Sequence, residues 1–183
     1  MIIGIVGSIA SGKDTVGEYL EKKGFVMISL SDVLRSIMRS EGVELTIPNM
    51  TRYGNDLRKK KGHGYLAKLA YKQAAGEDAV LTSIRQVGEI EYLRQFNDFT
   101  LIKLDAPIEI RLERLISRNR AGDVKNMKEL KKIEEKQADG KNGGMNMNEC
   151  FKMADLEIIN DRTFKDLYKE VDSVIERLRQ KKA

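Results

Sequence analysis

The segment Gly7–Thr15, GSIASGKDT, constrains this chain more than any other part of it. It has a glycine, four further residues and then Gly-Lys, and it follows the apolar run IIGIV at residues 2–6. Glycines in these places let backbone N–H groups surround phosphate oxygens, and a helix starting directly afterwards adds a favourable dipole. Residues 15–24 have the spacing of such a helix. Strand, loop and helix in this order predict a nucleotide-binding phosphate loop.

The residue after Lys13 departs from the standard pattern of such loops. A serine or threonine belongs there, because its hydroxyl touches the magnesium ion bound to the nucleotide. This chain has Asp14, followed by Thr15. A disabled site, a chance match and a working site with rearranged metal ligands are three interpretations of this departure.

Composition limits the class of protein. A chain of 183 residues with 41% hydrophobic residues suits one globular domain, and no apolar run reaches the ~18 residues of a membrane helix. With no secretory signal and Cys150 as the single cysteine, we expect a cytoplasmic protein without a membrane partner. The net charge of +5 favours an acidic ligand. Small phosphates fit better than nucleic acid, because few aromatic residues are interleaved with the basic ones.

Four more apolar runs, at residues 25–29, 79–84, 99–104 and 156–159, alternate with helical patterns. This alternation predicts an α/β fold with a five-stranded parallel sheet and helices on both faces. Ligands of such sheets bind beyond the carboxyl ends of the strands. The residues that follow predicted strand ends include Gly7, Ser31, Arg85 and Asn160.

The helices between the strands are predicted with less regular spacing. Ser31 is a candidate cap for a helix at 32–39, residues 49–75 indicate two helices divided at 62–64, and further helices are expected at 108–120 and 164–178. Residues 121–148 are polar and lysine-rich. This insertion is either a functional lid or a plain solvent-exposed helix.

Four further segments follow the loop in the order seen in nucleoside monophosphate kinases: ISLSDVLR (28–35), SIRQVGEIEYLR (83–94), LDAPIEIRLERLISRNR (104–120) and ADLEIIND (154–161). The chain thus resembles the P-loop nucleoside monophosphate kinase superfamily. It is most similar to small prokaryotic adenylate kinase-like and dephospho-CoA kinase-like proteins, which are related to kinase domains fused to deoxycytidylate deaminases. The resemblance implies one P-loop NTPase domain over 1–183. Its core would be 1–30, 77–120 and 154–183, with acceptor-binding helices at 31–76 and a lid at about 119–150.

The resemblance also implies which residues contact ATP. Lys13 would neutralise the outer phosphates, and Thr15 would bind an α-phosphate oxygen. The expected ATP-binding set is Gly7, Ser8, Ala10, Ser11, Gly12, Lys13, Asp14, Thr15, Arg118 and Asn160. Arg114 and Arg118 share a helical face near the lid, and with Lys13 and Arg85 they are the expected catalytic residues, because a transferring phosphoryl group needs positive charge around it. Ion pairs with Glu109 or Glu113 are the alternative, which we favour for Arg111.

The acceptor site is expected around two arginines. Asp32 and Arg35 have the Asp-x-x-Arg spacing in which the arginine contacts the acceptor's phosphate in adenylate kinases, and Arg85 follows the third strand as the second such arginine does. A guanidinium group matches phosphate oxygens with two parallel hydrogen bonds. Ser31 and Arg58 are further candidates for the same pocket. His63, between two glycines, is interpreted as a loop residue.

The metal ligands are the least regular part of the resemblance. Related sequences carry an acidic residue near the end of the third strand, where this chain reads Thr82-Ser83-Ile84-Arg85. Magnesium prefers oxygen ligands, with one or two carboxylates and several waters. Our hypothesis is that Asp14 supplies the carboxylate and that Thr82 or Ser83 offers a neutral oxygen.

Together these observations favour an ATP- and Mg²⁺-dependent phosphotransferase acting on a nucleoside or deoxynucleoside monophosphate, as a monomer or homodimer. Dephospho-CoA kinase is one alternative, although its Asp-x-Asp pattern after the second strand lacks its first aspartate at Leu30-Ser31-Asp32. An ATP-binding regulatory or RNA-associated P-loop protein with weak ATPase activity is the other.

Overall fold

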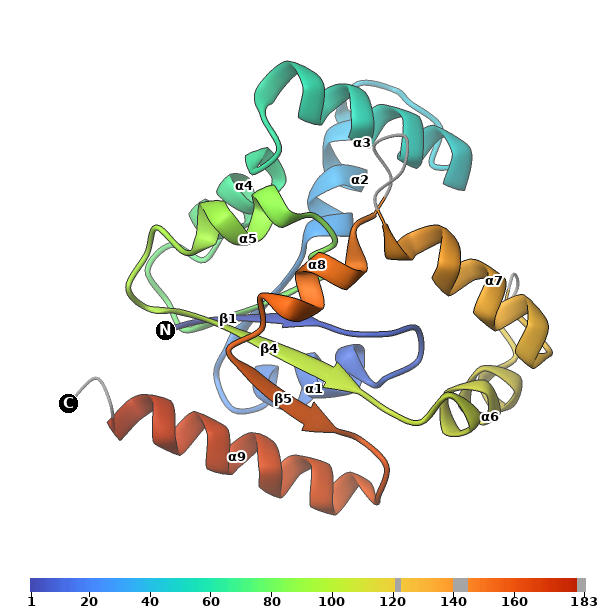
Figure 1. Ribbon diagram of the computed structural model, residues 1–183. Helices are drawn as coiled ribbons and strands as arrows, with labels where there is room; N and C mark the ends of the chain where they lie inside the picture. Colours follow the sequence, from blue (N-terminus) through green and yellow to red (C-terminus); the bar gives the residue numbers. More distant parts are fainter. Residues whose placement is uncertain (121–122, 140–144, 181–183) are drawn as a thin grey trace.

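The computed structural model describes residues 1–120, 123–139 and 145–180. Its centre is a parallel sheet of five strands in the order β2-β3-β1-β4-β5 (Figure 1). The strands are β1 (Ile2–Val6), β2 (Val26–Ser29), β3 (Ala79–Thr82), β4 (Phe99–Asp105) and β5 (Leu156–Ile159). The prediction of an α/β fold with five parallel strands is confirmed. β3 ends earlier than predicted, because Ser83 has φ 61, a left-handed conformation that no strand continues.

Helices cover both faces of the sheet. They are α1 (Lys13–Glu21), α2 (Leu30–Ser40), α3 (Ile47–Lys61), α4 (Tyr65–Gln73), α5 (Val87–Leu93), α6 (Ile108–Arg118), α7 (Met127–Ala138), α8 (Met147–Lys152) and α9 (Phe164–Gln180). α1 and α9 pack on one face, whereas α2, α4, α5 and α8 pack on the other. Successive strand residues point to opposite faces. Ile3 and Ile5 therefore lie in the apolar cluster with α1 and α9, and Ile2 and Val6 lie in the cluster on the other face. β1 is therefore fully buried. As the central strand, it has its carboxyl end in the middle of the row of strand ends on that side of the sheet.

α2 begins earlier than the sequence predicted. β2 ends at Ser29, and the helix starts at Leu30 with Ser29 as its N-cap residue. Ser31 lies in the first turn of α2, so the prediction that it caps the helix is wrong. Serine suits the N-cap at either position, although the side chain of Ser29 makes no capping hydrogen bond here.

The polar insertion contains a docked helix. In α7, Leu130 is fully buried and Ile133 packs with it against Leu115 of α6 and against Ile9 of the glycine-rich loop. α7 therefore has an apolar face and is more than a solvent-exposed helix. Residues 121–122 and 140–144 of the predicted lid lie outside the described residues.

Candidate functional site

The glycine-rich loop joins β1 to α1, and two of its glycines are required by close contacts. A Cβ added to Gly7 would lie 2.0 Å from the carbonyl oxygen of Leu104. Gly12 has φ 102, and a Cβ there would lie 2.5 Å from Nδ2 of Asn160. An L side chain fits neither position, so this loop conformation depends on glycine.

Asn160 and Arg114 form hydrogen bonds with backbone carbonyl groups of the glycine-rich loop. Asn160, which follows β5, is buried and donates from Nδ2 to the carbonyl oxygen of Ser11 at 2.8 Å. Arg114 donates to the carbonyl oxygens of Asn160 at 2.9 Å and Ala10 at 3.3 Å. The structure thus places both residues on the backbone of the loop. The contact of Asn160 with ATP and the catalytic role of Arg114 stay predictions.

The side chain of Lys13 folds back onto the first residues of the loop. Its Nζ donates to the carbonyl oxygens of Gly7 at 2.9 Å and Ser8 at 2.7 Å. The pKa of Lys13 is lowered to about 8, mainly by burial and also by the nearby charge of Arg85, while Asp14 opposes both. A phosphate oxygen would be a stronger partner for this ammonium group than the two carbonyls, because it carries negative charge.

Asp14 is exposed in the first turn of α1. Its carboxylate opposes the effect of burial, which lowers the pKa values of Lys13 and Arg85. It also contributes to the raised pKa of Arg118. Among residues 1–120, 123–139 and 145–180, no group of three or more His, Cys, Asp and Glu side chains could hold a metal ion. A magnesium ion that keeps its waters and binds ATP phosphates needs only one or two carboxylates, so this donor set fits such an ion.

The hydroxyl groups proposed for the metal lie at the end of β3. Thr82 is buried as the last residue of that strand. Ser83 is half-buried, and its Oγ accepts a hydrogen bond from Ser29 Oγ at 3.2 Å. Their role as ligands stays a prediction.

Three of the predicted acceptor residues are arginines from different parts of the chain, and their charges interact. Arg85 follows β3, Arg58 lies on α3 and Arg35 lies on α2. Burial lowers the pKa of Arg85, and the positive charges of Arg35 and Arg58 lower it further, against Glu89 and Asp14. Arg35 forms an ion pair with the exposed Asp32 at 2.6 Å. Arg58 and Arg85 contact the same carboxylate, Glu89, and Arg35 acts on Arg85 through its charge. Their role in binding an acceptor stays a prediction. Ser31, in the first turn of α2, is half-buried.

The basic residues of α6 have separate partners. Arg118 donates from Nε and Nη2 to Asp123, both at 2.7 Å, and this pair raises the pKa of Arg118. Arg111 is buried and donates to the carbonyl oxygens of Ala106 at 2.8 Å and Ile9 at 3.3 Å, and it forms an ion pair with Glu134 of α7.

The sequence prediction for Arg111 was wrong, because its partners are neither Glu109 nor Glu113. A signal for its burial was present in the sequence. Arg111 lies four residues before Leu115, so both share one face of α6. The acidic partner on α7 had no such signal.

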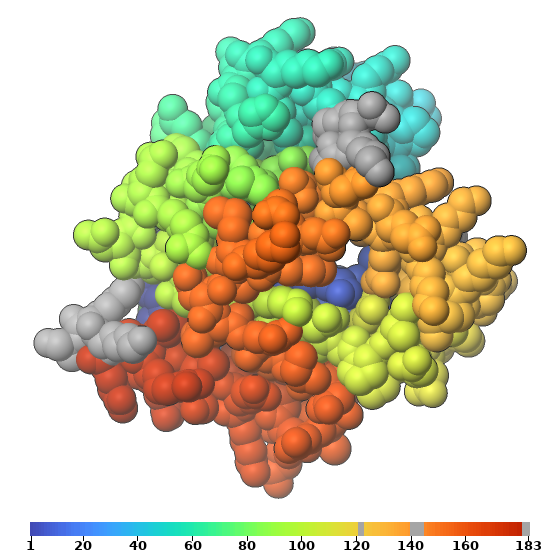
Figure 2. Space-filling view, in the orientation of Figure 1, coloured from blue at the N-terminus to red at the C-terminus, as the bar shows by residue number. Residues whose placement is uncertain are grey.

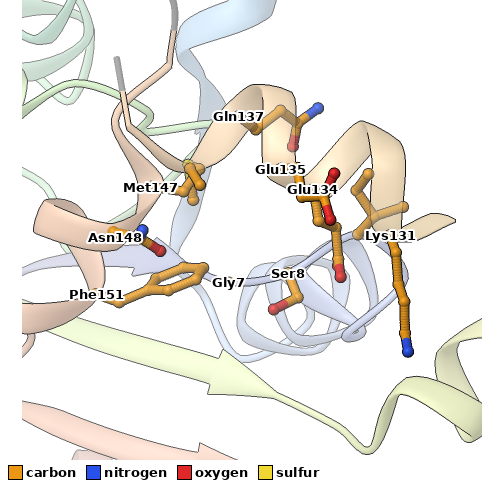
Figure 3. A pocket seen from close by; sticks show the side chains of 11 residues that line it. Gly7, Ser8, Lys131, Glu134, Glu135, Gln137, Met147, Asn148 and Phe151 are labelled. Atoms are coloured by element: carbon orange, nitrogen blue, oxygen red, sulfur yellow. The ribbon is translucent and has the colours of Figure 1, made fainter. Parts of the chain in front are cut away.

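A cavity of about 310 Å³ lies between the loop, α7 and α8 (Figure 3). It is lined by Gly7, Ser8, Ile9, Lys131, Glu134, Glu135, Gln137, Ala138, Met147, Asn148 and Phe151. In the space-filling view, a hollow opens between α7 and α8, with atoms of the N-terminal segment at its floor (Figure 2). The first residues of the phosphate loop are therefore reached through an opening that the insertion encloses.

Comparison with known proteins identifies the family. Residues 3–139 match the family model described as an AAA domain. The chain belongs to this family. It is also 31% identical over 179 residues to a UPF0200 protein of Methanothrix thermoacetophila, covering 97% of both chains. A UPF0200/UPF0201 protein of Archaeoglobus fulgidus is 29% identical over 184 residues, which are 97% of this chain. The match spans only 55% of the length of that relative.

Solved structures share the fold of this family member. The crystal structure of TT1252 from Thermus thermophilus has a TM-score of 0.62 and 20% identity, covering 97% of each chain. Shikimate kinase from Aquifex aeolicus has a TM-score of 0.55 and 20% identity, covering 96% of each chain. Dephospho-CoA kinase from Campylobacter jejuni has a TM-score of 0.53 and 18% identity, covering 97% of this chain and 96% of that one. The chain therefore has a P-loop kinase-like fold.

Within the described ranges, no helix is both long enough and apolar enough to cross a membrane.

Proposed function

We propose that this protein transfers the γ-phosphoryl group of ATP to a nucleoside or deoxynucleoside monophosphate. The observation that carries the proposal is that Arg58 and Arg85 contact the same buried carboxylate, Glu89, and that the charges of Arg35 and Lys13 interact with Arg85. Like charges repel, so such a group of cations suits a bound anion. An enzyme that only hydrolysed ATP would have no use for this second phosphate site.

Arg58 adds a separate reason. Its Nε is buried, and no other atom of the described residues forms a hydrogen bond with it. A buried donor without a partner destabilises a protein, and sites for absent ligands are a common reason to find one. A phosphate oxygen of the acceptor would satisfy this N–H group.

The reaction needs no nucleophile from the protein. An oxygen of the acceptor phosphate attacks the γ-phosphorus in line, a new P–O bond forms, and the bond to the β-phosphate oxygen breaks to release ADP. Lys13 and Arg85 balance the negative charge of the transferring group. A magnesium ion held by Asp14 and the ATP phosphates would supply further positive charge.

Dephospho-CoA kinase is the second candidate, because that enzyme shares the fold and Asp32 follows β2. Transfer to a ribose hydroxyl needs a base enclosed near the acceptor. Asp32 is 69% exposed and already paired with Arg35 at 2.6 Å, so the arrangement favours the monophosphate acceptor.

A panel of acceptors tests the proposal. The protein is incubated with ATP, MgCl₂ and, one at a time, each ribo- and deoxynucleoside monophosphate and dephospho-CoA, and ADP release and phosphorylated product are measured. Product from a monophosphate supports the proposal, and product from dephospho-CoA alone supports the second candidate. ADP release that no acceptor stimulates would contradict both and favour an ATP-binding regulatory or RNA-associated role.

A further inference from the structure

We infer that Glu89 is a positioning residue that holds Arg58 and Arg85 in one fixed arrangement for the acceptor phosphate. The inference rests on the proposed function. Glu89 lies in α5 and is 1% exposed. Its Oε2 accepts hydrogen bonds from the backbone N–H groups of Arg85 at 2.9 Å and Gln86 at 3.1 Å. Its Oε1 lies 3.5 Å from Nη2 of Arg58. One carboxylate thus joins the loop after β3 to α3.

The same helix end is joined to the acceptor helices by packing. A Cβ added to Gly88 would lie 2.4 Å from the Cβ of His63, in the turn between α3 and α4. Gly64 approaches as closely, because a Cβ there would lie 2.9 Å from the carbonyl oxygen of Gly88. The first turn of α5 therefore touches the end of α3 directly beside Glu89.

Arg85 is also held on its other side. The carbonyl oxygen of Arg85 accepts a hydrogen bond from the backbone N–H of Asn146 at 3.1 Å, just before α8. Its side chain donates from Nη1 to the sulfur of Met145 at 3.4 Å, and a thioether is a weak acceptor. The backbone of Arg85 is thus anchored at both ends, while its guanidinium group keeps donors for an anion.

A carboxylate is the group that this position needs. Both of its oxygens accept, so it can serve the two backbone N–H groups and Arg58 together. An amide of the same shape accepts at one end only and would place an N–H donor against donors at the other. Glu89 takes part in a capping box with Gln86, but such caps do not require a buried ion pair with a distant helix.

Substitution of Glu89 tests the inference. Glu89→Gln keeps the volume and removes one acceptor, and Glu91→Gln is the matched control on the exposed face of the same helix. KM for ATP, KM for the acceptor and kcat are measured with AMP, CMP, dCMP and dephospho-CoA, and thermal melting checks folding. We expect KM for the acceptor to rise about 10- to 100-fold in Glu89→Gln, as for other residues that orient contacting groups, with KM for ATP nearly unchanged. Glu91→Gln should behave as the wild type.

A second variant keeps the test decisive if Glu89→Gln does not fold. Glu89→Asp keeps the charge with a shorter reach, and it should raise KM for the acceptor less than Glu89→Gln does. Equal changes in both KM values, an unchanged KM for the acceptor, or failure of both variants to fold would overturn the inference. Wild-type protein that phosphorylates no nucleoside or deoxynucleoside monophosphate of the full acceptor panel would instead refute the proposed function, and the inference with it.

Discussion

Arg111 of α6 forms an ion pair with Glu134 of α7 while it donates a hydrogen bond to the carbonyl oxygen of Ile9 at 3.3 Å. One buried guanidinium group therefore fastens the inserted helix to the phosphate loop. The apolar contacts of Leu130 with Leu115 lie beside it. The position of α7 over the loop depends on this charge pair as well as on packing.

Glu134→Gln should destabilise the protein by about 1–3 kcal/mol, because it leaves the buried charge of Arg111 with only the more distant carboxylate of Asp105, at 3.8 Å. The free energy of unfolding is measured by urea denaturation. Glu135→Gln, at the exposed neighbouring position, is the control and should change stability by less than about 0.5 kcal/mol. Equal stability of the two variants would show that the ion pair does not hold α7.

Asp14→Asn should lower kcat about 100-fold and raise the magnesium concentration needed for half-maximal activity, because the proposed carboxylate ligand is lost. Turnover is measured over a magnesium titration, with Glu18→Gln on the exposed face of α1 as the control. Unchanged magnesium dependence would refute the role of Asp14.

A double variant tests more directly whether Asp14 takes the place of the acidic residue that related sequences carry near the end of the third strand. Asp14→Ser restores the usual hydroxyl but leaves no carboxylate at the site, so it should be nearly inactive. Adding Thr82→Asp to it recreates the arrangement of related sequences and should recover activity. If a folded double variant recovers no activity, Asp14 does not replace that acidic residue.

ATP binding should weaken as the pH rises through about 8, where the lowered pKa of Lys13 lies. The neutral amine no longer attracts phosphate, so Kd should rise by up to about tenfold per pH unit above this value. Bound phosphates favour the charged amine, and binding in this range should therefore take up a proton. Calorimetry in buffers of different ionisation enthalpy measures both effects. Lys13→Met should bind more weakly near neutral pH and show neither effect, and a wild-type profile in that variant would contradict the assignment.

Asn160→Ala should weaken ATP binding and lower the free energy of unfolding by about 1–3 kcal/mol, because the buried carbonyl oxygen of Ser11 loses its donor at 2.8 Å. Asp161→Ala, at the exposed next position, is the control. Titration with ATP and urea denaturation measure the two effects. If both variants resemble the wild type, the loop does not depend on this hydrogen bond.

Local patterns determined the phosphate loop and the strands of this protein. The glycine pattern of the loop and the apolar run of β1 each lie within a few consecutive residues, so a short segment carries the information. The resemblance added Arg35 and Arg85 as acceptor residues, with Arg58 as a further candidate, and in the structure Arg58 and Arg85 contact the same carboxylate. The identity of the acceptor depends on contacts that no single segment specifies.

Tertiary structure alone decided the partners of the buried charges. Arg111 and Glu134 are 23 residues apart, and Arg58 and Glu89 are 31 residues apart. Each carboxylate looks like an ordinary surface residue in its own helix. Only packing of the helices removes it from water, and a charge without water must find an opposite charge or hydrogen-bond donors nearby. The sequence therefore predicted the glycine-rich loop and the strands around it, whereas the fold decided which carboxylates pair with the arginines.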